Sequence, residues 1–262
     1  MAAVGERQIS YDARGLAEPN AEIPKISEVD GPTAVFDARD LTTRQINLEL
    51  RWLLYEQGVT DVTVKNPGSK HSIGVGILTR CKITYQGSLG YFGCGLIDGP
   101  EIHITGRVGW SACENMMSGV VVIEGNAGSL TGAALRGGDL VVKGRVGARS
   151  GIDQKGGTII TLGSAGSMNG FMMQRGRQVI CGDVGPGLGD SMYDGIMYVG
   201  GKVKSLGIDC VEGEWTDADT EFIERKFRIY GLGSPPEFQK FVCGKKLYHY
   251  DNLEPSERKL VL

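Results

Sequence analysis

Residues 124 to 170 read EGNAGSLTGAALRGGDLVVKGRVGARSGIDQKGGTIITLGSAGSMNG, and their glycines recur at a fixed interval of nineteen residues. The same step extends in both directions and gives a first series: Gly87, Gly106, Gly125, Gly144, Gly163, Gly182 and Gly201. A second series lies three residues further on: Gly90, Gly109, Gly128, Gly147, Gly166 and Gly185. A flexible linker has no reason to keep such a register, and a nucleotide-binding loop occurs only once. The spacing therefore indicates a repeat array.

A short alternating stretch precedes the first glycine of each repeat. The copies read EIHITG, VVVIEG, DLVVKG, TIITLG, RQVICG and IMYVGG. Alternation in β-branched residues predicts strands, with one face collecting apolar columns such as Ile102, Val121, Leu140 and Ile159. Gln178 and Thr161 interrupt these columns. A third series of small residues consists of Cys94, Cys113, Gly132, Gly151, Gly170 and Gly189.

These features predict an all-β fold, a right-handed parallel β-helix of about seven nineteen-residue coils over residues 81–211. Stacked coils place equivalent residues in ladders, so the two glycine series form a structural glycine ladder. Glycine is required in such a ladder either where φ is positive or where two walls approach closely. The sequence leaves open which reason applies to each series.

The segments on either side of the repeats have different compositions. Residues 1–34, which contain three prolines, are expected to form an extended N-terminal arm, and residues 35–80 a small α/β cap over the first coil. The cap contains a predicted helix that begins at Thr42 or Thr43, ends at Gly58 and carries an apolar stripe of Ile46, Leu50, Leu53 and Leu54. Residues 212–262 are expected to form a docking tail with a helical pattern and the aromatic residues Phe238, Phe241, Tyr248 and Tyr250.

Charge and cysteine content exclude several classes of protein. A formal net charge of -3 argues against a general nucleic-acid-binding protein. The N-terminus has no apolar signal-peptide stretch, and no apolar run approaches the roughly 20 residues needed to cross a bilayer. Six cysteines without a secretion signal favour a cytoplasmic protein with reduced thiols.

Few residues suggest chemistry. No Cys-x-x-Cys spacing, catalytic triad or paired-carboxylate motif is present, so we expect no catalytic, cofactor-binding or metal-binding residue in this chain. Cys94 and Cys113 share one ladder position on adjacent coils, about 5 Å apart, which is within disulfide range. In the cytoplasm two buried thiols are favoured over a disulfide. The glycines at 182–190, GDVGPGLGD, lack the strand, helix and acid of a dinucleotide-binding motif.

Two histidines and three arginines are the remaining candidates. His71, in GSKHSIG, is the histidine best placed for an interface, whereas His103 lies in a strand column and is expected to be packed or exposed. GRVGARSG places Arg145 and Arg149 near one corner, one coil from Arg107. These arginines fit a solvated edge better than an anion site or an acidic partner surface.

The repeated G-x-x-G pattern, in copies such as GRVGWSAC, GNAGSLTG and GSAGSMNG, resembles the glycine-motif β-helix domain at the C-terminal end of the large subunit of glutamate synthases. The flanking stretches VKNPGSKHSIGVGI and FIERKFRIYGLGSPPEFQKF are similar to the stand-alone version of this domain in three-subunit complexes such as N-methylglutamate synthase. The resemblance covers roughly residues 35 to 262. The glycine-ladder subunit of formylmethanofuran dehydrogenase, with its counterpart in formyltransferase/hydrolase complexes, has the same type of solenoid.

The resemblance implies a division of labour between subunits. One expected partner is a class II glutamine amidotransferase subunit, and the other is a glutamate-synthase-like subunit that binds FMN and often an iron–sulfur cluster. The β-helix chain itself would bind no cofactor and would brace the other two in a hetero-oligomer. A subunit of a formylmethanofuran-type complex and a free-standing solenoid binding protein remain the alternatives.

Overall fold

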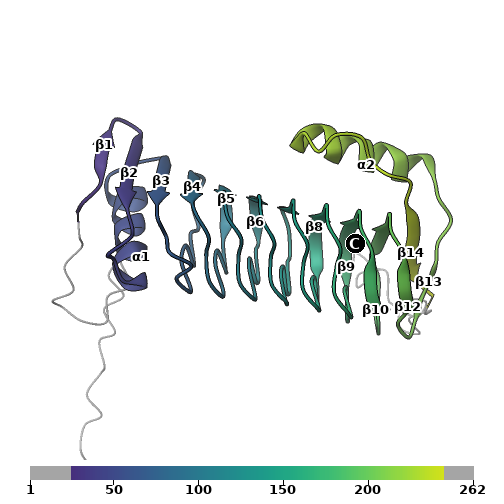
Figure 1. Cartoon of the computed structure of the whole chain (residues 1–262). Coiled ribbons are helices and arrows are strands. Elements are labelled where there is room, and N and C mark those ends of the chain that lie inside the picture. Colours follow the sequence, from purple (N-terminus) through teal and green to yellow (C-terminus); the bar gives the residue numbers. More distant parts are fainter. Residues whose placement is uncertain (1–24, 245–262) are drawn as a thin grey trace, which may run out of the picture.

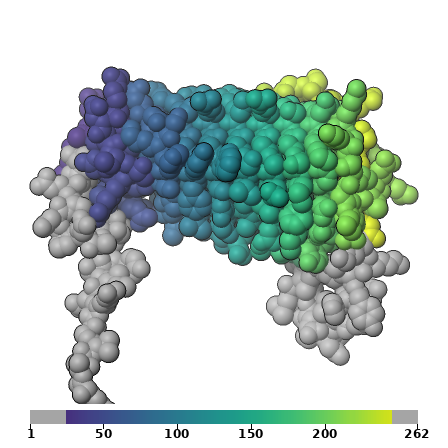
Figure 2. All heavy atoms as spheres, turned by 60° about the horizontal axis from the view of Figure 1, so that its bottom comes forward, coloured from purple at the N-terminus to yellow at the C-terminus, as the bar shows by residue number. Residues whose placement is uncertain are grey.

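The computed structural model describes residues 25–244. They form an elongated parallel β-solenoid, with one strand of the main sheet in each coil (Figure 1). In the space-filling view the coils follow one another as continuous bands along the rod (Figure 2). The expectation of an all-β solenoid is confirmed.

The main sheet contains twelve strands in the order β1-β2-β3-β4-β5-β6-β7-β8-β9-β11-β14-β13. Their bounds are β1 Glu28–Asp30, β2 Thr33–Asp37, β3 Asp61–Lys65, β4 Lys82–Gln86, β5 Asp98–Ile104, β6 Ser118–Ile123, β7 Asp139–Val142, β8 Lys155–Thr161, β9 Arg175–Ile180, β11 Ile196–Val199, β13 Cys210–Glu212 and β14 Gln239–Cys243. A two-stranded parallel sheet on another wall pairs β10, Val184–Leu188, with β12, Val203–Leu206. Strands β2 to β9 and β11 pair in parallel and define about eight turns.

The parallel sheet begins earlier than residue 81. From Lys82 to Ile196 the strands pair with residues nineteen positions further along, except that Asp98 with Ser118 and Lys155 with Arg175 are twenty apart, each next to a register shift. Thr33 nevertheless pairs with Asp61 and Asp61 with Lys82, which are steps of 28 and 21 residues. The first coil is longer because it contains helix α1, Thr43–Arg51. The glycine spacing therefore predicts the regular coils but misses the first two. The structure has about eight turns, whereas about seven coils were expected.

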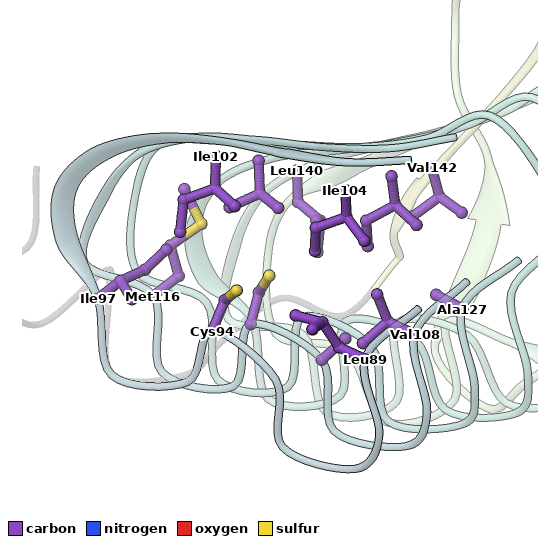
Figure 3. Packing of buried hydrophobic residues seen from close by; sticks show 14 of the residues in the cluster. Leu89, Cys94, Ile97, Ile102, Ile104, Val108, Met116, Ala127, Leu140 and Val142 are labelled. Carbon is purple, nitrogen blue, oxygen red and sulfur yellow. The ribbon is translucent and has the colours of Figure 1, made fainter. Parts of the chain in front are cut away.

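The interior of the solenoid is apolar and continuous. Ile102, Leu140 and the equivalent residues of the other strands point inward from the main sheet, and Leu89, Val108 and Ala127 point inward from the opposite wall (Figure 3). Isolated parallel bridges link Leu89 to Val108 and Val108 to Ala127 along that wall. Burial of apolar surface contributes roughly 25 cal/mol per Å² to the free energy of folding. The apolar ladders are therefore the main source of stability.

Gln178, which interrupts one column, is buried with a polar partner. Its Nε2 donates to Oε1 of Gln154 at 3.2 Å, and Nε2 of Gln154 donates to the carbonyl oxygen of Gly156 at 2.9 Å. Both side chains are fully buried or nearly so. The polar interruption is therefore compensated by hydrogen bonds inside the solenoid.

The three series of small residues have two different physical causes. A Cβ atom at Gly144 would lie 2.7 Å from the backbone carbonyl carbon of Gly125, and one at Gly163 would lie 2.8 Å from that of Gly144. Close approach of stacked coils therefore excludes side chains from the first two series. The third series instead has positive φ, from 56° at Cys94 and Cys113 to 69° at Gly170.

Each end of the solenoid is covered by other segments. At the start, β1 pairs antiparallel with β2, and the predicted stripe of α1 and its continuation is buried: Ile46, Leu50, Leu53 and Leu54. Thr42 is the N-cap, forming a capping box with Gln45, and a π-helical turn, Trp52–Glu56, ends the helix. At the other end β14 pairs antiparallel with both β11 and β13. These strands cover β2 and β11, the first and last parallel strands, and leave the three-residue strands β1 and β13 at the edges of the sheet, where short strands limit aggregation.

Helix α2, Asp217–Tyr230, lies across the outer face of the C-terminal half of the main sheet (Figure 1). Phe222, Ile223 and Phe227 pack against Val141, Ile160, Val179 and Tyr198. Phe241 of the expected docking tail is buried in the main core, and Phe238 packs beside α2. These parts of the tail pack on their own chain, because the outward-facing residues of the strands beneath α2 are apolar. Tyr248 and Tyr250, like residues 1–24 of the arm, lie outside the described residues.

Candidate interaction surfaces

Three aromatic side chains stack on the outside of the solenoid, and we call them the aromatic stack. The ring centroids of His71 and Tyr91 lie 4.5 Å apart, and those of Tyr91 and Trp110 lie 5.5 Å apart. The backbone N–H of Tyr91 donates to Nδ1 of His71 at 2.8 Å, which orients the imidazole ring. Tyr91 and Trp110 are 51% and 55% exposed. The stack therefore presents ordered aromatic surface to solvent.

The glycine ladder makes room for these rings. Gly109 precedes Trp110, and a Cβ atom at Gly109 would lie 2.5 Å from Cδ1 of Tyr91. In the next two coils Ser129 and Ala148 occupy the equivalent position, so the stack ends at Trp110. The local sequence singles out His71 alone. Tyr91 and Trp110 could also have been identified from the sequence, because they are nineteen residues apart and therefore occupy equivalent positions of adjacent coils.

Arg107, Arg145 and Arg149 are exposed, at the corner that follows the main-sheet strands. Arg107 and Arg145 are two coils apart rather than one, because Asn126 occupies the intervening coil. The side-chain oxygen of Asn126 accepts a hydrogen bond from the backbone N–H of Arg145 at 3.0 Å. The corner thus alternates arginine with asparagine.

The outer face of the main sheet is open where α2 does not cover it. A hollow of about 640 Å³ there is lined by Arg80, Lys82 and Glu101, among others, and a neighbouring one of about 290 Å³ by Thr84, His103 and Tyr230. Nε2 of His103 lies 2.8 Å from Oε1 of Glu124. Lys143, with a smaller contribution from His103, holds the pKa of Glu124 below its usual value. This part of the face is mixed in charge.

The stretch at 182–190 belongs to the glycine ladder. Residues 184–188 form β10, which pairs in parallel with β12. A Cβ atom at Gly182 or Gly185 would lie 2.7 Å from the backbone of the preceding coil. The space that a pyrophosphate would need beside these two glycines is thus filled by the chain itself.

Cys94 and Cys113 are fully buried thiols on adjacent coils, and both point into the apolar interior. Figure 3 shows Cys94 in this position beside the other core residues. Burial raises the pKa of Cys94 to about 12 and raises that of Cys113 well above its ordinary value. These thiols are therefore small core residues rather than nucleophiles.

Among residues 25–244, no three His, Cys, Asp or Glu side chains are grouped so that they could hold a metal ion. Over the same range no helix combines the length and apolar character needed to cross a membrane.

Comparison with known proteins finds a short match. No protein-family profile matches the chain. A segment of 66 residues is 38% identical to Protein GlxC of Rhizobium meliloti (strain 1021). The matched segment covers 24% of this chain and 29% of that protein, so less than a third of the relative's length is matched.

Proposed function

We propose that this chain is a non-catalytic scaffold subunit of a glutamate-synthase-like complex of the N-methylglutamate synthase type. In such a complex the amine of glutamate is exchanged for methylamine. A glutamine amidotransferase subunit and an FMN-dependent synthase subunit, which can also carry an iron–sulfur cluster, perform the chemistry. This chain binds none of these cofactors and holds the two partners in place.

The aromatic stack is the observation that carries this proposal. Protein interfaces depend on a few Trp, Tyr and Arg side chains, and two of these types are exposed and already ordered in Tyr91 and Trp110. Since the rings are stacked before binding, little side-chain entropy is lost when a partner covers them. Arg107 and Arg145, which are exposed, lie on the same solenoid two coils apart.

The solenoid supplies the rigidity that a scaffold needs. Each coil contacts the next through backbone hydrogen bonds and apolar ladders, and both ends are covered by antiparallel strands. A rod of this kind can fix two partners at a set separation. The resemblance of the glycine repeats and their flanks to glutamate-synthase subunits supplies the identity of those partners.

Affinity purification of the full chain from its native host tests the proposal. We expect an amidotransferase and a flavoprotein to co-purify, and methylamine-dependent turnover to require all three subunits. Flavin absorbance or turnover by this chain alone would contradict the scaffold role. A molybdenum or tungsten enzyme or an amidohydrolase in the purified material would instead support a formylmethanofuran-type complex, and an isolated monomer would support a free-standing binding protein.

Substitution in the aromatic stack tests the surface itself. The double variant Tyr91→Ala/Trp110→Ala should fold normally, since both side chains are more than half exposed, and should weaken assembly by tenfold or more. Ile208→Ala is the matched control, because Ile208 is 72% exposed and lies towards the far end of the solenoid. If both variants assembled equally well, the aromatic stack would not be part of the interface.

A further inference from the structure

A second surface lies where α2 overhangs the beginnings of three strands. Gly156, Gly157 and Thr158 of β8, Arg175, Gly176 and Arg177 of β9, and Asp194, Gly195 and Ile196 at the start of β11 form one side of a hollow of about 440 Å³. Phe222, Arg225 and Lys226 of α2 form the other side. Four of these residues are glycines, so backbone rather than side chains forms much of the floor.

Positive charge is concentrated around this hollow. Its lining contains four cations, Arg175, Arg177, Arg225 and Lys226, against the single acid Asp194. Lys226 is already neutralised, since its Nζ donates to both carboxylate oxygens of Asp139 at 2.6 Å. The lining thus carries more cationic than acidic side chains, in a chain whose formal net charge is -3.

The fold anchors one arginine of the lining and places another across the hollow from it. The guanidinium carbon of Arg177 lies 4.4 Å from the ring centroid of Phe222, which anchors this side chain against α2. Arg225 belongs to α2 itself, one residue from the Lys226–Asp139 ion pair that fixes the helix to β7. Two guanidinium groups, one on β9 and one on α2, therefore line the same hollow from opposite sides.

Thr158 adds a hydroxyl to the lining of the hollow. Thr158 is only 6% exposed and lines the hollow. Its hydroxyl can donate a hydrogen bond to a molecule bound in the hollow.

We propose that this hollow binds a small molecule that carries an oxyanion, either a phosphate or a carboxylate group. Arginine binds both groups through paired hydrogen bonds, and a hydroxyl can donate a further one. The volume is within the range of small-molecule sites. This site is separate from the aromatic stack and does not depend on the proposed scaffold role.

Titration of the full chain with inorganic phosphate, pyrophosphate and malonate tests the proposal. Binding is measured by calorimetry at constant ionic strength, with sodium chloride as the reference salt. We expect saturable binding of at least one oxyanion, and the tighter of the phosphate and malonate arms identifies the chemical source. No saturable binding beyond the chloride reference would overturn the proposal.

Variants locate the site. Arg225→Gln should weaken binding about tenfold or more, because a hydrogen bond between charged groups contributes roughly 1.5–3 kcal/mol. Thr158→Val, which removes only the hydroxyl, should weaken it several-fold. Arg228→Gln is the control, since Arg228 is exposed on the same helix but outside the lining. Equal affinities of the Arg225 and Arg228 variants would overturn the assignment to this hollow.

Discussion

The hydroxyl of Tyr198 donates a 2.6 Å hydrogen bond to Oδ1 of Asp219, which joins strand β11 to the first turn of helix α2. The other carboxylate oxygen of Asp219 accepts from Nζ of Lys240 at 2.8 Å and from the N-cap residue Thr216. One buried carboxylate therefore connects the sheet, the helix and the strand that covers the last coil.

Asp219→Asn should destabilise the protein, in a way that depends on pH. Burial alone would raise the pKa of Asp219, but hydrogen bonds from Lys240, Tyr198 and Thr216 outweigh it and hold the pKa well below its ordinary value. A lowered pKa means that the stabilisation is complete above the unfolded value near 3.9 and is lost as pH falls towards the folded pKa. Urea unfolding from pH 7 to pH 3 should show a difference of about 2 kcal/mol that shrinks in acid.

The control for this substitution is Asp217→Asn. Asp217 lies in the same first turn of α2 but is exposed. We expect the unfolding free energy of this variant to stay within about 0.5 kcal/mol of the unchanged protein. If both variants behaved alike, the effect would come from the helix dipole rather than from the Asp219 hydrogen bonds.

Gly144→Ala tests why the ladder consists of glycine. The added Cβ atom would lie 2.7 Å from the backbone of Gly125, and neither coil can move without disturbing the next. We expect a loss of roughly 2–3 kcal/mol in unfolding free energy, as for other overpacking substitutions.

Gly58→Ala provides the comparison for the ladder. Gly58 has φ of 68°, but a Cβ atom there would meet nothing within 4 Å. Its substitution should cost only the roughly 1–2 kcal/mol of a left-handed backbone. A larger loss for Gly58→Ala than for Gly144→Ala in thermal or urea unfolding would show that close approach is not what selects glycine in the ladder.

The repeat could be predicted from sequence because each coil makes the same contacts as its neighbours. The need for a residue without a side chain at Gly125 is then repeated at Gly144 and Gly163, so the sequence shows it as a regular period. Contacts that occur once leave no such pattern. The docking of Phe222 onto Tyr198 is one example, because the helical stretch alone does not say whether its partner is its own sheet or another protein.

The interaction surfaces were predictable only in part. His71 could be singled out by its local sequence, whereas its stacking on Tyr91 depends on coils of unequal length, 21 and then 19 residues, coming into register. The basic hollow combines Arg177 with Arg225, 48 positions apart in the chain. This pairing depends on where α2 crosses the sheet, and the spacing of residues in the sequence does not predict that position.

Cys94 and Cys113 should resist thiol reagents in the native protein. Burial raises the pKa of both thiols, so at pH 8 neither forms appreciable thiolate, and neither side chain is exposed. Alkylation with iodoacetamide followed by mass spectrometry should leave both unmodified in buffer and modify both in urea. Rapid native-state labelling at either position would show that the coils around it open.

Truncation of the C-terminal segment should separate folding from any function of the last residues. The sequence alone predicts that deletion of residues 235–262 leaves the solenoid folded while weakening assembly. In the structure, however, that deletion removes β14, which pairs with β11 and β13, together with the buried Phe241 and the Lys240 partner of Asp219. The last coil would keep an unpaired, apolar edge, and such edges promote aggregation.

We therefore expect the chain that ends at residue 234 to lose several kcal/mol of stability and to aggregate. A chain that ends at Gly244 keeps the pairing of β14 with β11 and β13 and should match the full chain in thermal unfolding. If it also assembles normally with its partners, residues 245–262 have no part in docking. Unchanged stability of the shorter chain would instead mean that β14 is dispensable for the solenoid.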